Sequence, residues 1–362
     1  MRLKILILIK CLILLLMSCS VSHQQIKTYS RSEQFNGNFF ININNVDMND
    51  ERDLISWFLE IDNKKWTKWI NTEYEKTVIN RTESGELVVT FINHSTLLIQ
   101  CDGINILTDP VWSDYVGPLP YLGLKRHRNP GMRFEDLPPI DYVILSHNHY
   151  DHFDLPTLIR LKEKFNPTIL VPLGDKEILI ENNFEKVIEL DWWEEVKLKN
   201  NQSIFFVPAQ HSSQRGLFDR YHSLWGGYVI TSEGGPIYFA GDTGFGPHFY
   251  QIKEKFGRMR LSLLPIGAYK PEILLKKFHI SPKEAVDAHL ILESQYSVGI
   301  HWGTFKQTIE DYYDPVKDLE KAKKERILNN TKFIVLKHGK AYKIPRLEPA
   351  LEHEFLIDGS TR

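Results

Sequence analysis

Short apolar runs separated by polar turns begin at residue 87 and continue to residue 344. The first three runs, 87–92, 96–100 and 104–107, are typical of strands, and the Asp102-Gly103 pair predicts a tight turn between the last two. The run 142–145 is apolar at every position, as is typical of a strand buried on both faces. The main body therefore opens with a β-meander, which is followed by a buried strand.

Further strands and three helices are predicted after residue 145. The strands are 168–171, 187–190, 203–207, 227–231, 237–239, 261–265, 297–300, 332–336 and 341–344, and the helices are 155–165, 282–293 and 315–328. Ser281 and Glu284 form a capping box around Pro282, so the start of the second helix is well specified. The charged residues between 317 and 325 indicate a solvated helix face. Many short strands with helices between them indicate an α+β fold in which helices sandwich two sheets.

The first 18 residues predict a secretory signal peptide, because basic residues precede an apolar run that is too short to span a bilayer. Residues 16–19, Leu-Met-Ser-Cys, resemble a bacterial lipobox, in which the cysteine is acylated. An acylated Cys19 would anchor the mature protein to the membrane of a bacterial cell envelope, on the extracytoplasmic side. The alternative is a plain cleaved signal in which this cysteine has no role.

Residues 19–45 are rich in Ser, Asn and Gln without an apolar period, and they predict a lipid-anchored tether outside the fold. Residues 46–80 contain apolar positions at helical spacing, which predict N-terminal helices. These helices either pack on the main domain or face a bilayer, and packing is favoured because aromatic stripes usually belong to cores. The main domain spans 81–346, and 347–362 form a C-terminal tail.

Charge and cysteine content restrict the class of protein further. The chain has 44 basic and 46 acidic residues and a formal charge of −2, so it lacks the basic surface that nucleic-acid binding requires. Its three cysteines are Cys11, Cys19 and Cys101, and the first two lie in or next to the signal segment. No disulfide framework can therefore stabilise the fold, which must rest on packing.

The densest chemistry follows the buried strand at 142–145. His147, His149, Asp151 and His152 place three imidazoles and one carboxylate within six residues, between a predicted strand and a predicted helix. Nitrogen and oxygen ligands at this density suit a zinc-like divalent ion, and few structural roles would explain them.

Three later residues complete the coordination in the same way, each just after an apolar strand. They are His211 after 203–207, Asp242 after 237–239 and His301 after 297–300. Polar residues at strand ends are expected on one rim of the sandwich. Together with the first cluster they supply seven ligands, enough for two metal ions.

These residues resemble the metallo-β-lactamase superfamily, whose hallmark is H-x-H-x-D-H followed by separate His, Asp and His ligands. More narrowly, the chain is similar to the family of N-acylphosphatidylethanolamine-hydrolysing phospholipases D and its bacterial relatives. The resemblance covers about residues 87–339. The segments that carry it are Asn93-His94-Ser95-Thr96, Leu107-Thr108-Asp109-Pro110, Leu137-Pro138-Pro139-Ile140-Asp141, Ser146 to Asp154, Pro265-Ile266-Gly267-Ala268-Tyr269, His301-Trp302-Gly303-Thr304-Phe305 and Leu336-Lys337-His338-Gly339.

The resemblance implies a four-layer αββα sandwich that holds two Zn²⁺ ions per chain. One zinc would be bound by His147, His149 and His211, the other by Asp151, His152 and His301, and Asp242 would bridge them. A hydroxide shared by the two metals would attack the substrate, and such a pair can stabilise both oxygens of a phosphoryl displacement. Asp151 would thus belong to the catalytic machinery as well as to the metal site.

Three further polar residues are expected near the metals. By the resemblance, Asp109 would hold a ligating histidine through its other ring nitrogen, although an ordinary Asp-Pro turn is equally compatible. His94 would support the site from behind, or be a hydrogen-bonded structural histidine. His279 matches a histidine of the phospholipase branch that would orient the substrate or stabilise a leaving group, and the alternative is a structural role.

Substrate contacts are predicted from Arg215, Arg128 and Tyr121, with Arg126 as a further candidate, because guanidinium groups suit phosphate oxygens. The alternative is that the basic residues of 125–128 belong to an ordinary solvated surface. Pro120 stands beside Tyr121 where the resemblance leads us to expect a polar head-group contact.

The function expected from these residues is zinc-dependent phospholipase D-type cleavage of N-acylated or related glycerophospholipids. One alternative is a sugar-phosphate lactonase or a small-molecule phosphodiesterase of the same fold, since a metal pair activates water for either reaction. A second alternative is a non-catalytic, lipid-anchored binding protein. A degenerate copy should have lost ligands, whereas this chain has all seven.

Overall fold

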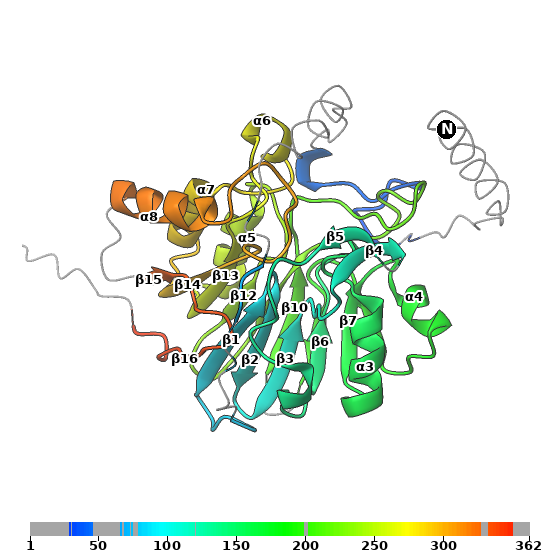
Figure 1. Cartoon of the computed structure of the whole chain (residues 1–362), viewed down its shortest axis with the longest axis horizontal. Helices are drawn as coiled ribbons and strands as arrows, with labels where there is room; N and C mark the ends of the chain where they lie inside the picture. Colours follow the sequence, from blue (N-terminus) through cyan, green and yellow to red (C-terminus); the bar gives the residue numbers. More distant parts are fainter. Residues whose placement is uncertain are drawn as a thin grey trace, which may run out of the picture.

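Two seven-stranded sheets face each other in the computed structural model, which describes residues 29, 31–45, 66, 69–72, 74, 79–119, 121–198, 202–326 and 332–349 (Figure 1). The first sheet has the order β16-β1-β2-β3-β6-β7-β8 and the second the order β15-β14-β13-β12-β11-β10-β9. Helices α3 and α4 cover the first sheet, and α5, α7 and α8 lie on the side of the second. The α+β sandwich with four layers is thereby confirmed.

The strands lie close to the positions that the apolar runs predict. Their bounds are β1 Leu87–Asn93, β2 Thr96–Cys101, β3 Ile104–Thr108, β4 Tyr115–Leu119, β5 Leu122–Lys125, β6 Tyr142–Ile144, β7 Thr168–Pro172, β8 Val187–Leu190, β9 Glu195–Lys197, β10 Ser203–Val207, β11 Gly227–Ile230, β12 Ile237–Phe239, β13 Leu261–Pro265, β14 Tyr296–Ile300, β15 Lys332–Ile334 and β16 Ala341–Lys343. Only β4, β5 and β9 were not predicted. β4 and β5 form a separate hairpin.

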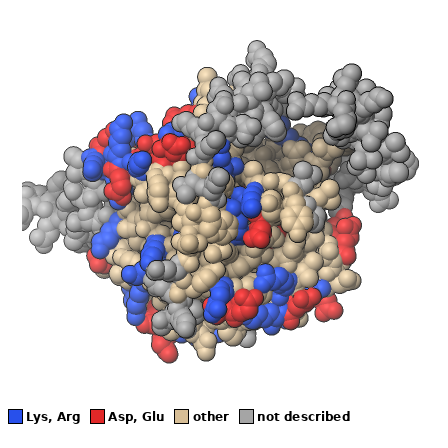
Figure 2. Space-filling model, in the orientation of Figure 1, with Lys and Arg blue, Asp and Glu red and all other residues tan. Residues whose placement is uncertain are grey.

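Five of the described helices were not predicted, three α-helices and two short 3₁₀ helices. The bounds are η1 Ile43–Asn45, η4 Phe134–Asp136, α3 Leu155–Phe165, α4 Lys176–Glu181, α5 His248–Phe256, α6 Glu272–Leu275, α7 Pro282–Ile291 and α8 Asp314–Arg326. The predicted capping box at the start of α7 is present, with Ser281 N–H donating to Glu284 Oε2 over 2.8 Å. Charged side chains gather over α8 in Figure 2, while Leu319 is buried on its inner face. No helix among the described residues is long and apolar enough to span a bilayer.

The main core lies between the two sheets. Val89 and Phe91 of the first sheet belong to the same buried cluster as Phe206 and Tyr228 of the second. A second cluster joins the outer face of the first sheet to α3, with Leu158 packed among its members. Because both faces of the central strands are covered, their sequences are apolar without alternation. Burying each such side chain stabilises the fold by about 1.5–3 kcal/mol.

The strand directions explain how distant residues reach one edge of the sandwich. β3, β6, β7 and β8 are mutually parallel, as are β12, β13, β14 and β15. β10 and β12 both pair with β11 in the antiparallel sense, so they point the same way as each other. The carboxyl ends of β6, β10, β12 and β14 therefore deliver the segments that follow them to the same edge.

The segment before the main domain departs from the prediction of a free tether. In residues 31–44, Phe40 is buried, and its ring lies 5.1 Å from that of Tyr29 and 5.2 Å from that of Phe35. Asn42 is also buried. Turns rather than a regular element bring these aromatic rings together, so no regular spacing of apolar residues in the sequence indicates that they pack. This part of the segment belongs to the fold, whereas residues 1–28 and their predicted signal peptide and Cys19 lie outside the described residues.

The predicted N-terminal helices also lie almost wholly outside the described residues. Within 46–80, Trp66 is buried and its Nε1–H donates to the Glu310 carbonyl over 2.7 Å. At the other end, the Leu347 N–H donates to the Gly234 carbonyl over 2.8 Å, so the domain extends slightly into the predicted tail. The remainder of that tail, from residue 350, is not described.

Candidate metal centre

Three imidazoles converge where the segment after β6 meets the segment after β10. His147 Nε2 lies 2.8 Å from His149 Nδ1, and His211 Nε2 lies 3.3 Å from the same Nδ1 atom. His147 and His211 are buried. Burial, together with the neighbouring imidazoles, holds the pKa values of both well below the usual range of histidine. Neutral imidazoles with converging nitrogen atoms are the protonation state and arrangement that zinc requires.

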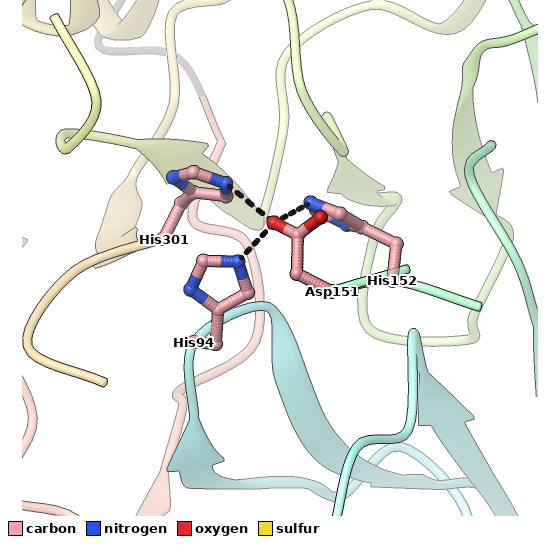
Figure 3. A group of neighbouring side chains, drawn as sticks. All are labelled: His94, Asp151, His152 and His301. Carbon is pink, nitrogen blue, oxygen red and sulfur yellow. Dashed lines mark hydrogen bonds and ion pairs between the residues drawn. The ribbon is translucent and has the colours of Figure 1, made fainter. Parts of the chain in front are cut away.

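A second group forms around the carboxylate of Asp151 (Figure 3). Its Oδ2 atom lies 2.9 Å from His94 Nε2, 3.3 Å from His152 Nε2 and 3.7 Å from His301 Nε2. The four side chains come from three distant parts of the sequence and point toward one another in Figure 3. Two imidazoles and one carboxylate of this group, those of His152, His301 and Asp151, can supply a second set of metal ligands.

Asp242 lies between the two groups. Its Oδ2 atom is 3.1 Å from both His152 Nε2 and His301 Nε2, and 3.9 Å from His211 Nε2. Burial by itself raises the pKa of Asp242, but the facing His152 and His301 hold it well below its usual range. An ionised carboxylate at this position can contact both sets. The structure thus brings all seven predicted ligands together.

Several buried polar atoms of this cluster have no hydrogen-bond partner among the described residues. They include His152 Nε2, His301 Nε2 and Asp242 Oδ1. Leaving such a group unpaired costs about 1–3 kcal/mol, and more if it is charged. Burial lowers the pKa of His152, yet Asp242 and Asp151 outweigh that effect and raise it well above the usual range, so these carboxylates attract positive charge. Bound metal ions would satisfy both requirements, and the donor set therefore fits them.

Asp109 orients one of these imidazoles from behind. Its Oδ2 accepts from His152 Nδ1 over 2.6 Å, and its two carboxylate oxygens also accept from the N–H and Oγ–H of Ser146. This arrangement leaves His152 Nε2 directed toward the centre. The Phe278 carbonyl does the same for His211, accepting from Nδ1 over 2.9 Å. Hydrogen bonds of this kind fix the orientation and basicity of metal-ligating histidines.

His94 lies next to Asp151, and His279 lies next to Asp242. His94 is buried behind Asp151, where burial lowers its pKa to about 3, so a neutral ring donates to the carboxylate. His279 Nδ1 lies 3.8 Å from Asp242 Oδ2, and burial lowers the pKa of His279 to about 4. The structure therefore places His279 within reach of the centre.

The predicted substrate residues occupy different places from those expected. Arg215 Nη1 donates to the carbonyls of Asn148 and Phe153 over 2.9 and 2.8 Å, so it holds the loop 146–154 of the candidate metal centre in shape. Arg128 is buried, with Nη1 donating to Tyr312 Oη over 2.8 Å and Nη2 to Thr72. Its predicted phosphate contact is corrected to a structural role, because protein acceptors already occupy its guanidinium group.

Arg126 and Tyr121 also differ from the prediction. Arg126 is buried, and its Nε donates to the Ser113 carbonyl over 2.8 Å, away from solvent. Tyr121 stands at the turn between β4 and β5 with 83% of its surface exposed, and its ring lies 5.6 Å from that of Tyr115. Neither side chain contacts the metal cluster in the described structure.

Two residues of the site escaped the sequence analysis. Gln307 Nε2 donates to Asp151 Oδ2 over 2.7 Å. Asn42 holds the backbone of His211 on both sides: its Nδ2 donates to the His211 carbonyl over 2.9 Å, and its Oδ1 accepts from the His211 N–H over 3.0 Å. No local signal marks either residue, because an isolated Asn or Gln is common anywhere on a surface.

The buried carboxyl group of Asp175, which contacts Asn148 of the loop 146–154, should make the stability of the fold depend on pH. Its carboxyl accepts from Asn148 Nδ2 over 2.9 Å, and burial raises its pKa to about 7. In the unfolded chain it ionises near pH 4, so the folded state binds the extra proton between about pH 4 and 7. Stability should fall by up to about 4 kcal/mol as pH rises through this window. Chemical unfolding of the metal-free protein at pH 5 and pH 8 measures this loss.

Asp175→Asn should lose less stability than the wild type between the two pH values, because the amide does not ionise. Asp219→Asn is the control, since Asp219 is only half-buried and accepts from backbone N–H groups of its own loop. An identical pH dependence in wild type and Asp175→Asn would contradict the prediction.

Comparisons with known proteins agree with this geometry. A model of the β-lactamase superfamily domain matches residues 104–302. An N-acyl-phosphatidylethanolamine-hydrolyzing phospholipase D of Caenorhabditis elegans is 40% identical over 276 residues, which cover 72% of this chain and 76% of the worm protein. A mitochondrial enzyme of the same description from Saccharomyces cerevisiae is 38% identical over 252 residues, 67% of this chain and 54% of the yeast protein. The structure of Igni18, a metallo hydrolase from Ignicoccus hospitalis, matches with a TM-score of 0.55 at 22% identity and covers 71% of this chain and 98% of that one.

The chain belongs to the β-lactamase superfamily and has its metallo-β-lactamase fold. Within that superfamily it is a homologue of the N-acyl-phosphatidylethanolamine-hydrolysing phospholipases D, as the sequence motifs predicted. It is a metal-dependent hydrolase, and its His and Asp cluster can bind metal. The alternative of a non-catalytic binding protein is therefore not supported.

Proposed function

We propose that this protein is a dinuclear zinc phospholipase D that hydrolyses N-acylated or related glycerophospholipids. The observation that carries the proposal is the position of Asp242, whose Oδ2 lies 3.1 Å from His152 Nε2 and 3.1 Å from His301 Nε2 while remaining near the first imidazole group. A carboxylate shared between two ligand sets is what a two-metal hydrolase needs. The phospholipase D relatives favour a phospholipid as the substrate.

His147, His149 and His211 would hold one zinc, Asp151, His152 and His301 the other, and Asp242 both. When bound, the two ions would activate water at neutral pH and neutralise charge that develops on the phosphoryl oxygens. This chain's own residues keep the ligands in the required state. Hydrogen bonds from His94 and Gln307 hold Asp151 as a carboxylate, and Asp109 keeps His152 Nε2 directed inward.

The reaction adds water to phosphorus, breaks the bond to the head-group oxygen and transfers a proton to that oxygen. The products are phosphatidic acid and an N-acyl amino alcohol. His279 supports the last step because its Nδ1 lies 3.8 Å from Asp242 Oδ2, at the border of the cluster. From there its ring can hydrogen-bond the leaving oxygen.

The test is to incubate zinc-loaded protein with a bacterial lipid extract, with an N-acylated phosphatidylethanolamine and with a panel of lactones and cyclic nucleotides. Mass spectrometry should detect phosphatidic acid and the released amide alcohol. His279→Gln should lower kcat more than it changes KM, with the metal content unchanged. Turnover confined to lactones or nucleotides, with every phospholipid untouched, would refute the lipid substrate and leave a lactonase or small-molecule phosphodiesterase.

The proposal includes attachment to the bacterial cell envelope through an acylated Cys19. It rests on the Leu-Met-Ser-Cys sequence at residues 16–19. Labelled fatty acid should enter the wild type but not Cys19→Ser, and the variant should leave the membrane fraction under high salt. Equal labelling of both proteins would remove the anchor from the proposal.

A further inference from the structure

A cavity of about 470 Å³ lies next to the loop 146–154 and has no part in the proposed function. The buried residues that line it include Asn148, Asp175 and Ser223, and none of the seven predicted metal ligands lines it. Cavities of roughly 300–1,000 Å³ hold small organic molecules in proteins. This cavity is therefore large enough for a ligand of its own, separate from the metal centre.

Aromatic side chains of the N-terminal segment form one wall of the cavity. They are those of Tyr29, Phe35 and Phe39. The segment is held in place because the Phe40 N–H donates to the Tyr221 carbonyl over 2.9 Å. Phe39 is 43% exposed, and its ring lies 5.4 Å from that of His222, which also lines the cavity. Aromatic rings can pack on an apolar ligand, and their faces attract a cation.

Carboxylates dominate the charge of the cavity. Four of them are among the lining residues, those of Asp175, Glu177, Glu181 and Asp219, and no Lys or Arg of the described residues lines it. Burial raises the pKa of the Tyr29 hydroxyl, and the carboxylates of Glu189 and Glu177 raise it further. Negative charge thus reaches the aromatic wall as well, so the cavity attracts a cation.

Two buried oxygen atoms of the lining accept no hydrogen bond from the described residues. Asn148 Nδ2 donates to Asp175 Oδ1 over 2.9 Å and to Ser223 Oγ over 2.6 Å, whereas Asn148 Oδ1 and Asp175 Oδ2 have no partner. Both side chains are more than nine-tenths buried, with exposures of 5% for Asn148 and 0% for Asp175. Buried acceptors are normally paired, so a ligand that brings N–H donors would satisfy both.

An amine suits these two oxygen atoms better than a metal ion does. The described residues form several groups of three or more possible metal ligands within 4.8 Å of one another, and none of these groups includes Asp175. A divalent ion such as Ca²⁺ takes about six to eight oxygen ligands. A protonated amine has three N–H donors and a positive charge, and its carbon body can use the aromatic wall.

We propose that this cavity binds a primary amine in its ammonium form, carried on an apolar or aromatic body. The ammonium group donates to Asp175 Oδ2 and Asn148 Oδ1, and the body packs against the aromatic wall. Hydrogen bonds in which both partners are charged are the strongest of their kind. The inference does not rest on the proposed function, because it uses neither a metal ion nor a phospholipid substrate.

The experiment titrates the zinc-loaded full-length protein with 2-(4-fluorophenyl)ethylamine at pH 8 and follows the ligand by ¹⁹F NMR. At this pH an alkylamine is protonated, and Asp175, whose pKa is about 7, is ionised. Binding should saturate at close to one equivalent per chain. The uncharged 2-(4-fluorophenyl)ethanol should bind at least about tenfold more weakly, because it cannot form the charged hydrogen bond. Equal affinity of the two ligands would overturn the proposal.

Three variants locate the site. Asp175→Asn should weaken amine binding at least about tenfold, because the amide carries no charge. Phe39→Ala should weaken it about threefold through loss of a ring beside the ligand. Glu181→Gln should weaken it by a smaller factor, since Glu181 is exposed on α4. Phe39 and Glu181 are not buried, so these two variants keep the test decisive if Asp175→Asn does not fold. Unchanged affinity in the folded variants would overturn the proposal.

Ile180→Ala and Glu163→Gln are the matched controls. Ile180 is 46% exposed on the same helix, α4, without lining the cavity, and Glu163 is an exposed glutamate of α3. Both variants should bind the amine as the wild type does. A loss of affinity in the controls equal to that in Phe39→Ala and Glu181→Gln would contradict the assignment of the site.

Asp242→Ala separates the cavity from the metal centre, where an amine could also bind. This variant should lose zinc and keep the wild-type affinity for the amine. Loss of amine binding in Asp242→Ala, with normal binding in Asp175→Asn, would place the amine on the metal ions and overturn the proposal. Displacement of the amine by millimolar Ca²⁺ would assign the cavity to a metal ion instead.

Discussion

Replacing Asp242 with alanine should remove both metal ions and lower kcat/KM by about a thousandfold or more. The carboxylate lies 3.1 Å from the Nε2 atoms of both His152 and His301 and 3.9 Å from His211 Nε2, so neither ligand set is complete without it. Loss of several kcal/mol of charge stabilisation in the transition state corresponds to a rate effect of this size. Elemental analysis of zinc-replete protein, paired with steady-state kinetics, measures both quantities.

The wild type should contain close to two zinc equivalents per chain, and His147→Ala should lose metal as Asp242→Ala does. Asp311→Ala is the control, because Asp311 is an exposed carboxylate that precedes α8. A folded wild type that binds no zinc, or full metal content in Asp242→Ala, would contradict the two-metal assignment.

Most of the strands and the residues of the candidate metal centre could be predicted because their signals are local. A strand covered on both faces must be apolar at nearly every position, so runs such as 142–145 and 297–300 stand out. In parallel strands the carboxyl ends meet at one edge, and a His or Asp just past such a run is therefore placed there by topology. His301, which follows β14, is an example: its ring lies within the cluster although about 150 residues separate it from His152.

Two of the α-helices that escaped prediction, α4 and α6, are too short for their period to be seen. α4 and α6 span six and four residues, which is less than two turns, and one apolar face cannot be distinguished from chance over that length. The packing of the aromatic side chains of Tyr29, Phe35 and Phe40 could not be predicted for a related reason. They pack through turns, and a turn leaves no regular spacing in the sequence.

The roles of the arginines could not be predicted because the residue type does not identify its partner. An arginine that binds phosphate cannot be distinguished in the sequence from an arginine that binds backbone carbonyls. Arg215 was predicted to contact the substrate, and in the structure it joins Asn148 to Phe153 across the loop 146–154. Only the tertiary fold, which brings these carbonyls within 2.9 Å of Nη1, reveals this role.

Asn42→Ala should lower the zinc affinity about tenfold to a hundredfold, although Asn42 is predicted to contact no metal. Its side chain donates to the His211 carbonyl and accepts from the His211 N–H and from Trp225 Nε1, all within 3.1 Å. Alanine removes every one of these hydrogen bonds, and mutation of groups that orient metal ligands typically has an effect of this size. Competition with a chromophoric chelator measures the zinc affinity directly.

Asn42 is predicted to act by positioning His211, which distinguishes it from a residue that only stabilises the fold. The variant should lose about 2–4 kcal/mol of stability in EDTA, since buried backbone groups are left unpaired. It should lose still more stability in zinc, because weaker binding supports the folded state less. Asn38→Ala, an exposed position in the same segment, should match the wild type in both conditions. Equal losses for Asn42→Ala with and without zinc would show that the residue supports the fold alone and that His211 finds its position without it.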